Sequence, residues 1–214
     1  MSHKVHPIGF RLKDTQGWAS RWIAKKDYPK LLEEDVRIRA YLSKKLKEAG
    51  IASIEIERQA GKLNIIISTG RPGLVIGRGG SGIEELRRAL LKLIGTARKT
   101  EIKLDIREIR NPWESASLTG QAIAQQLEKR MPFRRVLKQT LSKIMSTKGI
   151  EGARIEIAGR LGGADMSRRE WVQDGRLPRQ TLRANIDYAQ VVATTTYGTI
   201  GIKVWIYKGE IFDN

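Results

Sequence analysis

The chain has 214 residues, of which 40% are hydrophobic, and it carries 40 Lys and Arg against 23 Asp and Glu, a formal net charge of +17. A chain of this length can form one or two domains with a substantial core. It contains no Cys, which excludes disulfide bonds and thiolate zinc sites. It has neither an apolar run of about 18 residues nor an apolar signal-peptide core, so we expect an intracellular protein without a membrane partner.

The excess of positive charge indicates a polyanionic partner. Basic side chains outnumber acidic ones both before and after Asn111, so the charge is not confined to a tail. A charge that serves only solubility amounts to about 2 to 8 on a small domain. The observed excess is much larger, and we therefore expect the chain to bind nucleic acid.

Hydrophobic periodicity predicts the elements of the first half. Leu31, Ile38 and Leu42 share one helical stripe, which Pro29 opens. The pattern predicts, in chain order, a helix over residues 29–49, strands over 54–56 and 63–67 joined as a hairpin by 59–62, a short helix over 71–75, a helix over 83–93 that ends at Gly95, and a strand over 102–106. The order is α-β-β-α-α-β, and Asn111-Pro112 marks a domain boundary.

A glycine-rich loop, Gly77-Arg78-Gly79-Gly80, lies before the helix predicted over residues 83–93. Glycine has no Cβ to hold a phosphate away from the backbone, and the following helix adds free N–H groups and the positive end of its dipole. Ser81 and Glu84 have the spacing of a capping box that would open this helix. We therefore expect the four loop residues to contact a nucleic-acid backbone.

The sequence pattern of the second half of the chain predicts helices followed by strands. Ser115 is a candidate cap for a helix along Ala116, Ile123 and Leu127, and Pro132 begins another helix that continues to about residue 147. Strands are predicted over residues 153–158, 182–188, 191–197 and 200–206, with a glycine-rich loop over 159–163. Helices packed on a mostly antiparallel sheet follow from this pattern, so the fold class of the chain is α+β.

The second helix of this half is unusually basic. Residues 129–148 contain no acidic side chain and seven basic ones, Lys129, Arg130, Arg134, Arg135, Lys138, Lys143 and Lys148. In a helix that begins at Pro132, residues 133, 137, 141 and 144 form the core stripe, and Arg134, Arg135 and Lys138 share one exposed sector. Solvated faces usually mix charges of both signs. We interpret the sector as a phosphate-binding site, with an inert solvated face as the alternative.

Aromatic side chains offer a second way to bind RNA, because unpaired bases stack on them. The chain contains Trp18, Trp22, Trp113, Trp171 and Trp205. None of them lies near the glycine loop in the sequence, so packing in a core or an interface is favoured over base stacking.

Enzymatic interpretations fit the sequence poorly. The glycine loop also matches the string G-x-G-x-x-G of dinucleotide-binding enzymes, with Glu101 as the ribose acid. However, Pro72 and Gly73 leave little room for the strand that must precede such a loop. No Gly-Lys-Ser/Thr phosphate loop occurs, and the two histidines, His3 and His6, lie in the N-terminal tail. We expect no enzyme, no metal site and no cofactor.

Several motifs resemble those of a known family. Residues 75–83, VIGRGGSGI, resemble the core of the KH domain, and the order α-β-β-α-α-β is similar to its bacterial type II arrangement. Segments at residues 4–12, 70–77, 133–135, 159–164, 181–188 and 196–210 resemble, in the same order, the bacterial type of the small-subunit ribosomal protein S-three family. The chain differs from the family pattern at Arg179-Gln180 and Asn185, and it ends without the longer tail that many members carry.

The resemblance implies a structural component of the head of the small ribosomal subunit, in the cytoplasm or an organelle. Its partners would be ribosomal RNA, mRNA and neighbouring small-subunit proteins. We expect a basic N-terminal segment over residues 1–16, a type II KH domain over 17–110, a C-terminal α+β domain over 111–210 and a short tail over 211–214. A free KH-type translation or RNA-decay factor would share the charge and the loop, and is the alternative.

The resemblance also assigns roles to three groups of residues. The KH loop, Gly77, Arg78, Gly79 and Gly80, would bind RNA. Arg134, Arg135 and Lys138 would line the pore through which mRNA enters the ribosome and would help to unwind structured mRNA. Lys4, His6 and Arg11 would anchor the N-terminal segment on ribosomal RNA.

Overall fold

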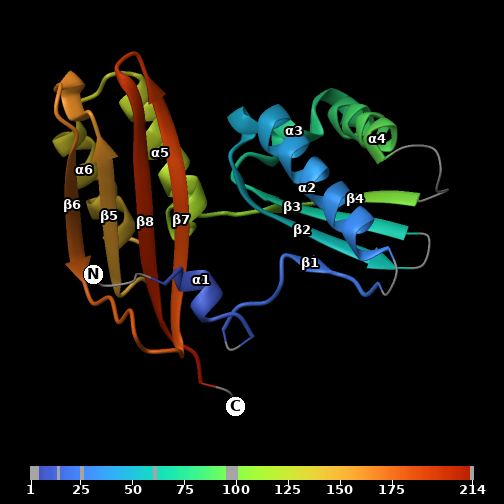
Figure 1. Ribbon diagram of the computed structural model, residues 1–214, viewed down its shortest axis with the longest axis horizontal. Helices are drawn as coiled ribbons and strands as arrows, with labels where there is room; N and C mark the ends of the chain where they lie inside the picture. Colours follow the sequence, from blue (N-terminus) through green and yellow to red (C-terminus); the bar gives the residue numbers. More distant parts are fainter. Residues whose placement is uncertain (1–4, 14, 25–26, 60–61, 95–100, 213–214) are drawn as a thin grey trace. The chain divides into compact units, whose positions relative to one another are not determined.

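The computed structural model describes residues 5–13, 15–24, 27–59, 62–94 and 101–212. These residues form two compact units (Figure 1). One unit comprises residues 18–110, and the other combines the first 17 residues with residues 111–214.

The unit of residues 18–110 has the order that the sequence predicts. It consists of β1 (Ser20–Arg21), α2 (Tyr28–Lys45), η1 (Lys47–Ala49), β2 (Ile51–Gln59), β3 (Lys62–Thr69), α3 (Pro72–Ile76), η2 (Arg78–Gly80), α4 (Ser81–Ile94) and β4 (Glu101–Glu108). The sheet order is β1-β2-β3-β4, in which β2 and β3 pair antiparallel and the outer pairs are parallel. The α-β-β-α-α-β arrangement of a type II KH domain is confirmed, with the short strand β1 added at the sheet edge.

Helices α2, α3 and α4 cover one face of this sheet (Figure 1). Alternate strand residues turn inward and meet the apolar stripes of the helices, so the interior is almost entirely aliphatic. Its buried members include Ile38, Leu42, Ile56, Leu63, Ile65, Ile67, Val75, Leu86 and Leu90. The prediction that Gly95 ends α4 lies outside the described residues.

A buried ion pair between α2 and β2 lies beside β1, at the start of the same unit. Asp35 of α2 is only 2% exposed, and its carboxylate accepts hydrogen bonds from Trp22 Nε1 at 2.8 Å and from two guanidinium nitrogens of Arg58. Arg39 donates to the Ala19 carbonyl and to the Ser20 hydroxyl. A buried carboxylate is stable only when it is paired in this way. These contacts hold a two-residue strand that has no hydrophobic pattern of its own.

The second unit is built from α1 (Pro7–Phe10), η3 (Pro112–Glu114), α5 (Ala116–Glu128), α6 (Phe133–Met145), β5 (Gly152–Gly159), η4 (Leu161–Gly163), β6 (Arg168–Gly175), β7 (Ala184–Thr195) and β8 (Gly198–Glu210). Its sheet has the order β6-β5-β8-β7, and every neighbouring pair is antiparallel. The predicted α+β class is confirmed. Two details of the prediction are wrong: β6 was not expected, and the separate strands over 182–188 and 191–197 are one continuous strand.

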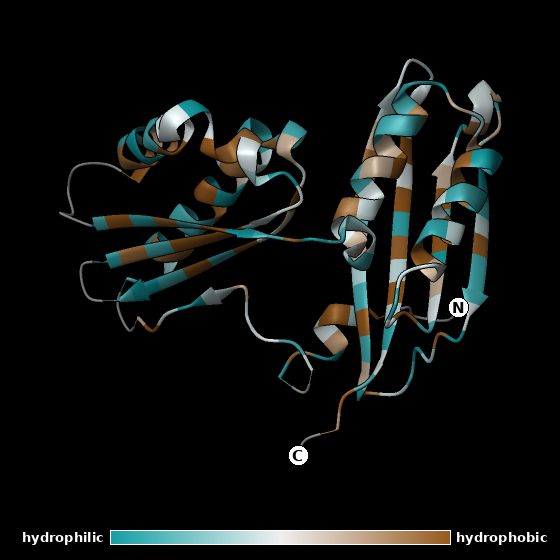
Figure 2. Ribbon diagram, turned by 180° about the vertical axis from the view of Figure 1, so that it is seen from behind, coloured by the Kyte–Doolittle hydropathy of each residue, from teal (hydrophilic) through white to brown (hydrophobic). Residues whose placement is uncertain are grey.

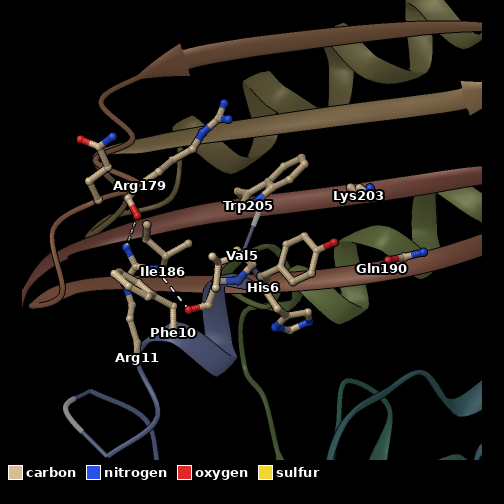
Figure 3. A pocket seen from close by; sticks show the side chains of 12 residues that line it. Val5, His6, Phe10, Arg11, Arg179, Ile186, Gln190, Lys203 and Trp205 are labelled. Atoms are coloured by element: carbon tan, nitrogen blue, oxygen red, sulfur yellow. Dashed lines mark hydrogen bonds between the residues drawn. The ribbon is translucent and has the colours of Figure 1, made fainter. Parts of the chain in front are cut away.

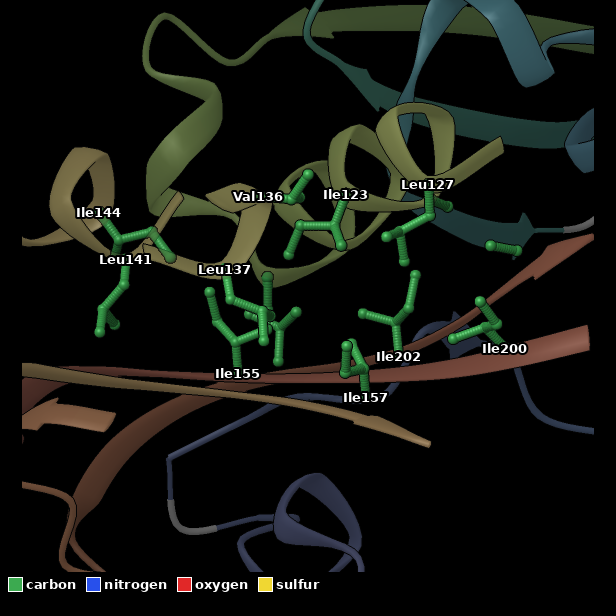
Figure 4. Close-up of a cluster of buried hydrophobic side chains, with 14 of the residues drawn as sticks. Ile123, Leu127, Val136, Leu137, Leu141, Ile144, Ile155, Ile157, Ile200 and Ile202 are labelled. Atoms are coloured by element: carbon green, nitrogen blue, oxygen red, sulfur yellow. The ribbon is translucent and has the colours of Figure 1, made fainter. Parts of the chain in front are cut away.

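Helices α5 and α6 pack on one face of this sheet. Hydrophobic and hydrophilic residues alternate along its strands (Figure 2). Most of the hydrophobic ones turn toward the helices, whereas Ile186 and Tyr188 of β7 lie on the opposite face. Figure 4 shows the resulting cluster, in which Ile123, Val136, Leu137 and Ile144 of the helices meet Ile155, Ile157 and Ile202 of the sheet. The opposite face of the sheet carries no long helix among the described residues, and charged and aromatic side chains lie on it.

The start of α5 is capped across the unit. Ser115 occupies the cap position that the sequence predicts, but its side chain makes no capping hydrogen bond. Instead, the buried N–H of Ala116 donates to Asp187 Oδ2 on β7 at 2.8 Å. An acidic side chain at this position also interacts favourably with the helix dipole. The long-range carboxylate therefore replaces the local cap.

Candidate nucleic-acid interface

The glycine loop links α3 to α4 through a tip of positive-φ residues. Gly77, Gly79 and Gly80 have φ values of 72°, 59° and 83°, which side-chain-bearing residues rarely adopt. A Cβ placed on Gly79 or Gly80 would meet no other atom within 4 Å. The tip is thus exposed backbone with the single side chain of Arg78 projecting from it, a shape that a nucleic-acid backbone can approach closely.

Gly77 and Gly82 bring the helices on either side of the tip together. A Cβ on Gly82 would lie 2.6 Å from the Val75 carbonyl oxygen and 2.9 Å from that of Ile76. A Cβ on Gly77 would lie 2.9 Å from the Gly82 nitrogen. Since these distances are below any normal contact, α3 and α4 can approach this closely only because both positions are glycine. This role of Gly82 could not be predicted from the sequence, because the close approach depends on the packing of α3 on α4.

The predicted capping box at Ser81 and Glu84 is wrong. Ser81 has φ −57° and ψ −34°, which is already helical, whereas a capping residue has an extended backbone. The 3₁₀ turn over Arg78–Gly80 leads directly into α4, and the N–H of Ser81 donates to the Arg78 carbonyl. The Glu84 carboxylate instead accepts from Arg88 one turn further on, at 3.4 Å.

The surface beside the loop is apolar. Leu74 and Ile76 of α3 are 59% and 38% exposed, while Val75 between them is buried. Exposed apolar side chains next to an accessible backbone can contact bases while the backbone contacts phosphates. Arg78 is exposed at the tip, and Arg87 and Lys92 are exposed along α4.

The basic sector of α6 lies where the sequence places it. Arg134, Arg135 and Lys138 are exposed, whereas Val136 and Leu137 between them are buried. In the described part of the chain, no carboxylate lies within salt-bridge distance of Arg135 or Lys138. Their charges are therefore available to an anion from outside the chain.

Arg134 differs, because the unpredicted strand β6 supplies it with an acidic neighbour. Its guanidinium lies 3.8 Å from the carboxylate of Glu170, which Arg168 also approaches at 3.5 Å. Both arginines lie over the ring of Phe133, at 5.8 and 5.4 Å from its centre. Residues 129–148 contain no acidic side chain, but Arg134 still has an acidic neighbour from a distant part of the sequence. The ion pair is weak, since Arg134 is 73% exposed.

The N-terminal segment packs into the second unit instead of forming a tail. Lys4 lies outside the described residues. His6 caps α1 by accepting the N–H of Gly9, and its ring meets that of Tyr188 edge-on at 4.9 Å. Arg11 is only 1% exposed, and its guanidinium donates to backbone carbonyls of Pro7 and of residues 178, 179 and 181. Arg11 therefore joins the segment to the loop between β6 and β7.

Other classes of site have little support in the described part of the chain. No three His, Cys, Asp or Glu side chains gather there in a way that could hold a metal ion. None of the helices formed by the described residues combines the length and hydrophobicity needed to span a membrane.

Comparisons with known proteins agree with this geometry. A family model described as KH domain matches residues 37–114, and one described as Ribosomal protein S3, C-terminal domain matches residues 123–206. The chain is 52% identical over 213 residues to the small ribosomal subunit protein uS3 of Desulfovibrio desulfuricans, covering 100% of this chain and 98% of the relative. It is 50% identical over 212 residues to the same protein of Synechocystis, and this similarity covers 99% of this chain and 87% of the relative. The chain belongs to the uS3 family.

Membership of the uS3 family confirms the resemblance that the sequence motifs indicated. RNA binding and a place in translation follow from this family and from its KH domain. The KH match includes the glycine loop, and the match to the uS3 C-terminal domain includes all of α6. The N-terminal segment with His6 and Arg11 lies outside both models but within the full-length similarity to uS3 of Desulfovibrio desulfuricans.

Proposed function

We propose that the chain is a structural, non-enzymatic constituent of the head of the small ribosomal subunit in the cytoplasm. It binds ribosomal RNA and neighbouring ribosomal proteins, and α6 lines the pore through which mRNA enters. The observation that carries this proposal is the exposed pair Arg135 and Lys138, whose charges no described carboxylate neutralises. Exposed cations of this kind bind phosphates without reading the sequence of the bases. Mobile mRNA of any sequence can pass such a surface.

The KH loop has a separate role in this proposal. Its tip offers backbone and one cation to a short single-stranded RNA segment, as KH loops generally do with about four nucleotides. Replacing both Arg78 and Gly79 by Asp introduces two carboxylates near the phosphates, and Asp is one of the few residues besides Gly that adopt the left-handed φ of position 79. At about 6 Å and an effective dielectric constant near 20, each repulsion is about 2 to 3 kcal/mol before screening. We expect the affinity for single-stranded RNA to fall while the fold persists. An unchanged dissociation constant would show that the loop is only a turn and does not bind RNA.

The α6 sector is tested by changing Arg134, Arg135 and Lys138 to Ala. RNA binding should weaken for all sequences, and the slope of log K against log salt should flatten by about 1.5 to 2, at about 0.7 per phosphate on a single strand. Arg134 contributes least, because Glu170 already pairs with it. A control variant with three other exposed cations of the same unit changed to Ala, Lys148, Arg176 and Lys208, removes the same charge elsewhere.

Translation by reconstituted ribosomes distinguishes the mRNA role from simple anchoring. Ribosomes that carry the α6 variant should translate messages with a stable downstream hairpin more slowly than unstructured messages, relative to the control variant. Equal slowing of both messages, or none, would leave α6 as a ribosomal-RNA anchor or a solvated face. Retention of the chain on ribosomes after a high-salt wash separates this proposal from a free KH-type factor, which would be released.

A further inference from the structure

The face of the second sheet that α5 and α6 leave open contains a pocket of about 500 Å³. Figure 3 shows that β7 and β8 form its floor, that residues of the N-terminal segment form one wall, and that Arg179 lies at one end with Lys203 at the other. Trp205 and Tyr188 provide aromatic surface within it, their rings 5.2 Å apart. The volume lies in the range of small-molecule sites, about 300 to 1,000 Å³.

The N-terminal segment completes this pocket. Helix α1 packs against β7, where the His6 ring contacts Tyr188 edge-on. Phe10 and Ile186 add apolar lining. The hydrogen bonds from Arg11 to residues 178–181 hold the wall in place. The pocket is thus preformed by a rigid wall, which limits the entropy that a ligand must lose on binding.

The electrostatics of the pocket favour an anion. None of its lining residues is acidic, whereas Arg179 and Lys203 are cationic. The nearby carboxylate of Glu156 is already neutralised, because Arg154 and Arg169 both donate to it. Burial, together with repulsion from Arg154, lowers the pKa of Arg179 despite the attraction of Glu156. Cations therefore outnumber carboxylates around the pocket, although Glu156 attracts Arg179 and lies opposite Lys203 in the sheet register.

The ring of Trp205 remains accessible to a flat ligand. The guanidinium groups of Arg179 and Arg154 each lie 5.9 Å from the centre of this ring, and Arg154 stacks more closely on Trp171, at 4.1 Å. The longer distance is compatible with a ligand that uses the ring of Trp205 and the charge of Arg179 together. Aromatic rings flanked by cations are the combination that binds single-stranded nucleic acid.

We propose that this pocket binds one unpaired nucleotide of an RNA strand, with its base against Trp205 and Tyr188 and its phosphate between Arg179 and Lys203. The proposal rests on the RNA-binding function above and adds a site outside the KH loop and α6. RNA is favoured over a protein segment because the pocket combines two flat rings with two cations at its ends. A peptide would need several adjacent carboxylates to give the same charge complementarity.

The test uses the full chain and a short single-stranded oligouridylate that carries 4-thiouridine, followed by mapping of the cross-linked peptides. We expect cross-links to the peptide containing Tyr188. Trp205→Leu should lower their yield at least about five-fold, because base stacking on an aromatic side chain contributes about 1 kcal/mol or more. Trp205→Phe should restore most of the yield, because Phe keeps an aromatic ring. If Trp205→Leu and Trp205→Phe have the same melting temperature, a purely structural role of Trp205 predicts no such difference in yield.

A charge variant provides an independent measurement. Arg179→Ala with Lys203→Ala should lower the cross-link yield at Tyr188 and flatten its salt dependence, whereas the matched control Lys148→Ala with Lys208→Ala should leave both unchanged. An oligonucleotide with abasic sites should compete several-fold less well than the parent. Equal competition would refute base stacking.

The outcomes separate this inference from the proposed function. RNA that binds and cross-links only outside the pocket would overturn the inference and leave the RNA-binding proposal intact. A chain that binds no single-stranded RNA would overturn both. If the pocket cross-links to a neighbouring protein instead of RNA in assembled small subunits, it is a protein docking site and the inference is wrong.

Discussion

Replacing Gly82 by Ala tests whether contact between α3 and α4 sets the shape of the RNA-binding loop. The new methyl group would lie 2.6 Å from the Val75 carbonyl oxygen and 2.9 Å from that of Ile76, and both atoms belong to rigid backbone. Relief requires α3 and α4 to separate, and overpacking of this kind costs about 1 to 3 kcal/mol. Alanine regains up to about 1 kcal/mol of helix propensity. With the full gain in propensity, we expect a net loss of up to about 2 kcal/mol.

Gly73→Ala is the matched control, since Gly73 lies in α3 and a Cβ there would meet nothing within 4 Å. It should be neutral or stabilise the chain by about 0.4 to 1 kcal/mol. Hydrogen exchange of peptides from residues 62–94 measures both effects within the KH unit. Gly82→Ala should also weaken binding to single-stranded RNA, because the tip between the helices is displaced. Equal protection and equal RNA affinity in the two variants would refute the close-approach argument.

Two further predictions concern the second unit. Asp187→Ala leaves the buried N–H of Ala116 without its acceptor and should lower stability by about 1 to 2 kcal/mol, whereas Asp187→Asn should lose less; thermal unfolding measures both. Burial raises the pKa of Glu156, but hydrogen bonds from Arg169 and Arg154 outweigh it and leave the pKa below its ordinary value. This stabilisation is therefore present above about pH 5 and is lost as the pH falls through the lowered pKa of the folded state. Glu156→Gln should flatten the acid limb of stability measured by urea unfolding, and an unchanged limb would contradict the assignment.

The KH unit could be predicted from the sequence because each of its main elements carries a regular hydrophobic period. The helix predicted over residues 29–49 appears as α2 and η1, and the two strands of the hairpin pair with Gln59 opposite Lys62. Strand β1 was missed, since two residues carry no pattern. The capping box failed for a different reason: Ser81 follows a 3₁₀ turn that is already helical, so no extended cap position exists there.

The errors in the second unit have tertiary causes. Strand β6 lies at the edge of the sheet and is mostly exposed, so it lacks the alternation that predicts a strand. The sequence predicted two strands in place of β7, because the apolar residues of β7 lie on one face of the sheet in its first part and on the other face in its second part. Ile186 and Tyr188 line the open-face pocket, whereas Ala193 joins the core under the helices. The change from one face to the other shifts the hydrophobic period by one residue within a continuous strand.

The candidate site was only partly predictable for the same reason. Residue type and local spacing place Arg135 and Lys138 on an exposed helical face. They could not show that Glu170 of β6 lies beside Arg134, or that the carbonyls of residues 178–181 bury Arg11. Anchoring of the N-terminal segment on ribosomal RNA by Arg11 stays a prediction, and the hydrogen bonds of its guanidinium within the chain are what the sequence could not show. The charge pattern of a sequence can predict a basic surface. It cannot predict which of the basic side chains are paired with groups that are distant in the sequence.

The three candidate RNA contacts should differ in what they recognise. The loop tip offers backbone, and α6 offers long cationic side chains, so both bind phosphates and neither discriminates strongly between bases. Within the described part of the chain, the pocket around Trp205 combines aromatic surface with cations at both ends. Any dependence of affinity on the presence of bases should therefore come mainly from this pocket, with a smaller share from Leu74 and Ile76 beside the loop. Abasic and base-containing strands should accordingly bind the Trp205→Leu variant with more similar affinities than they bind the parent chain.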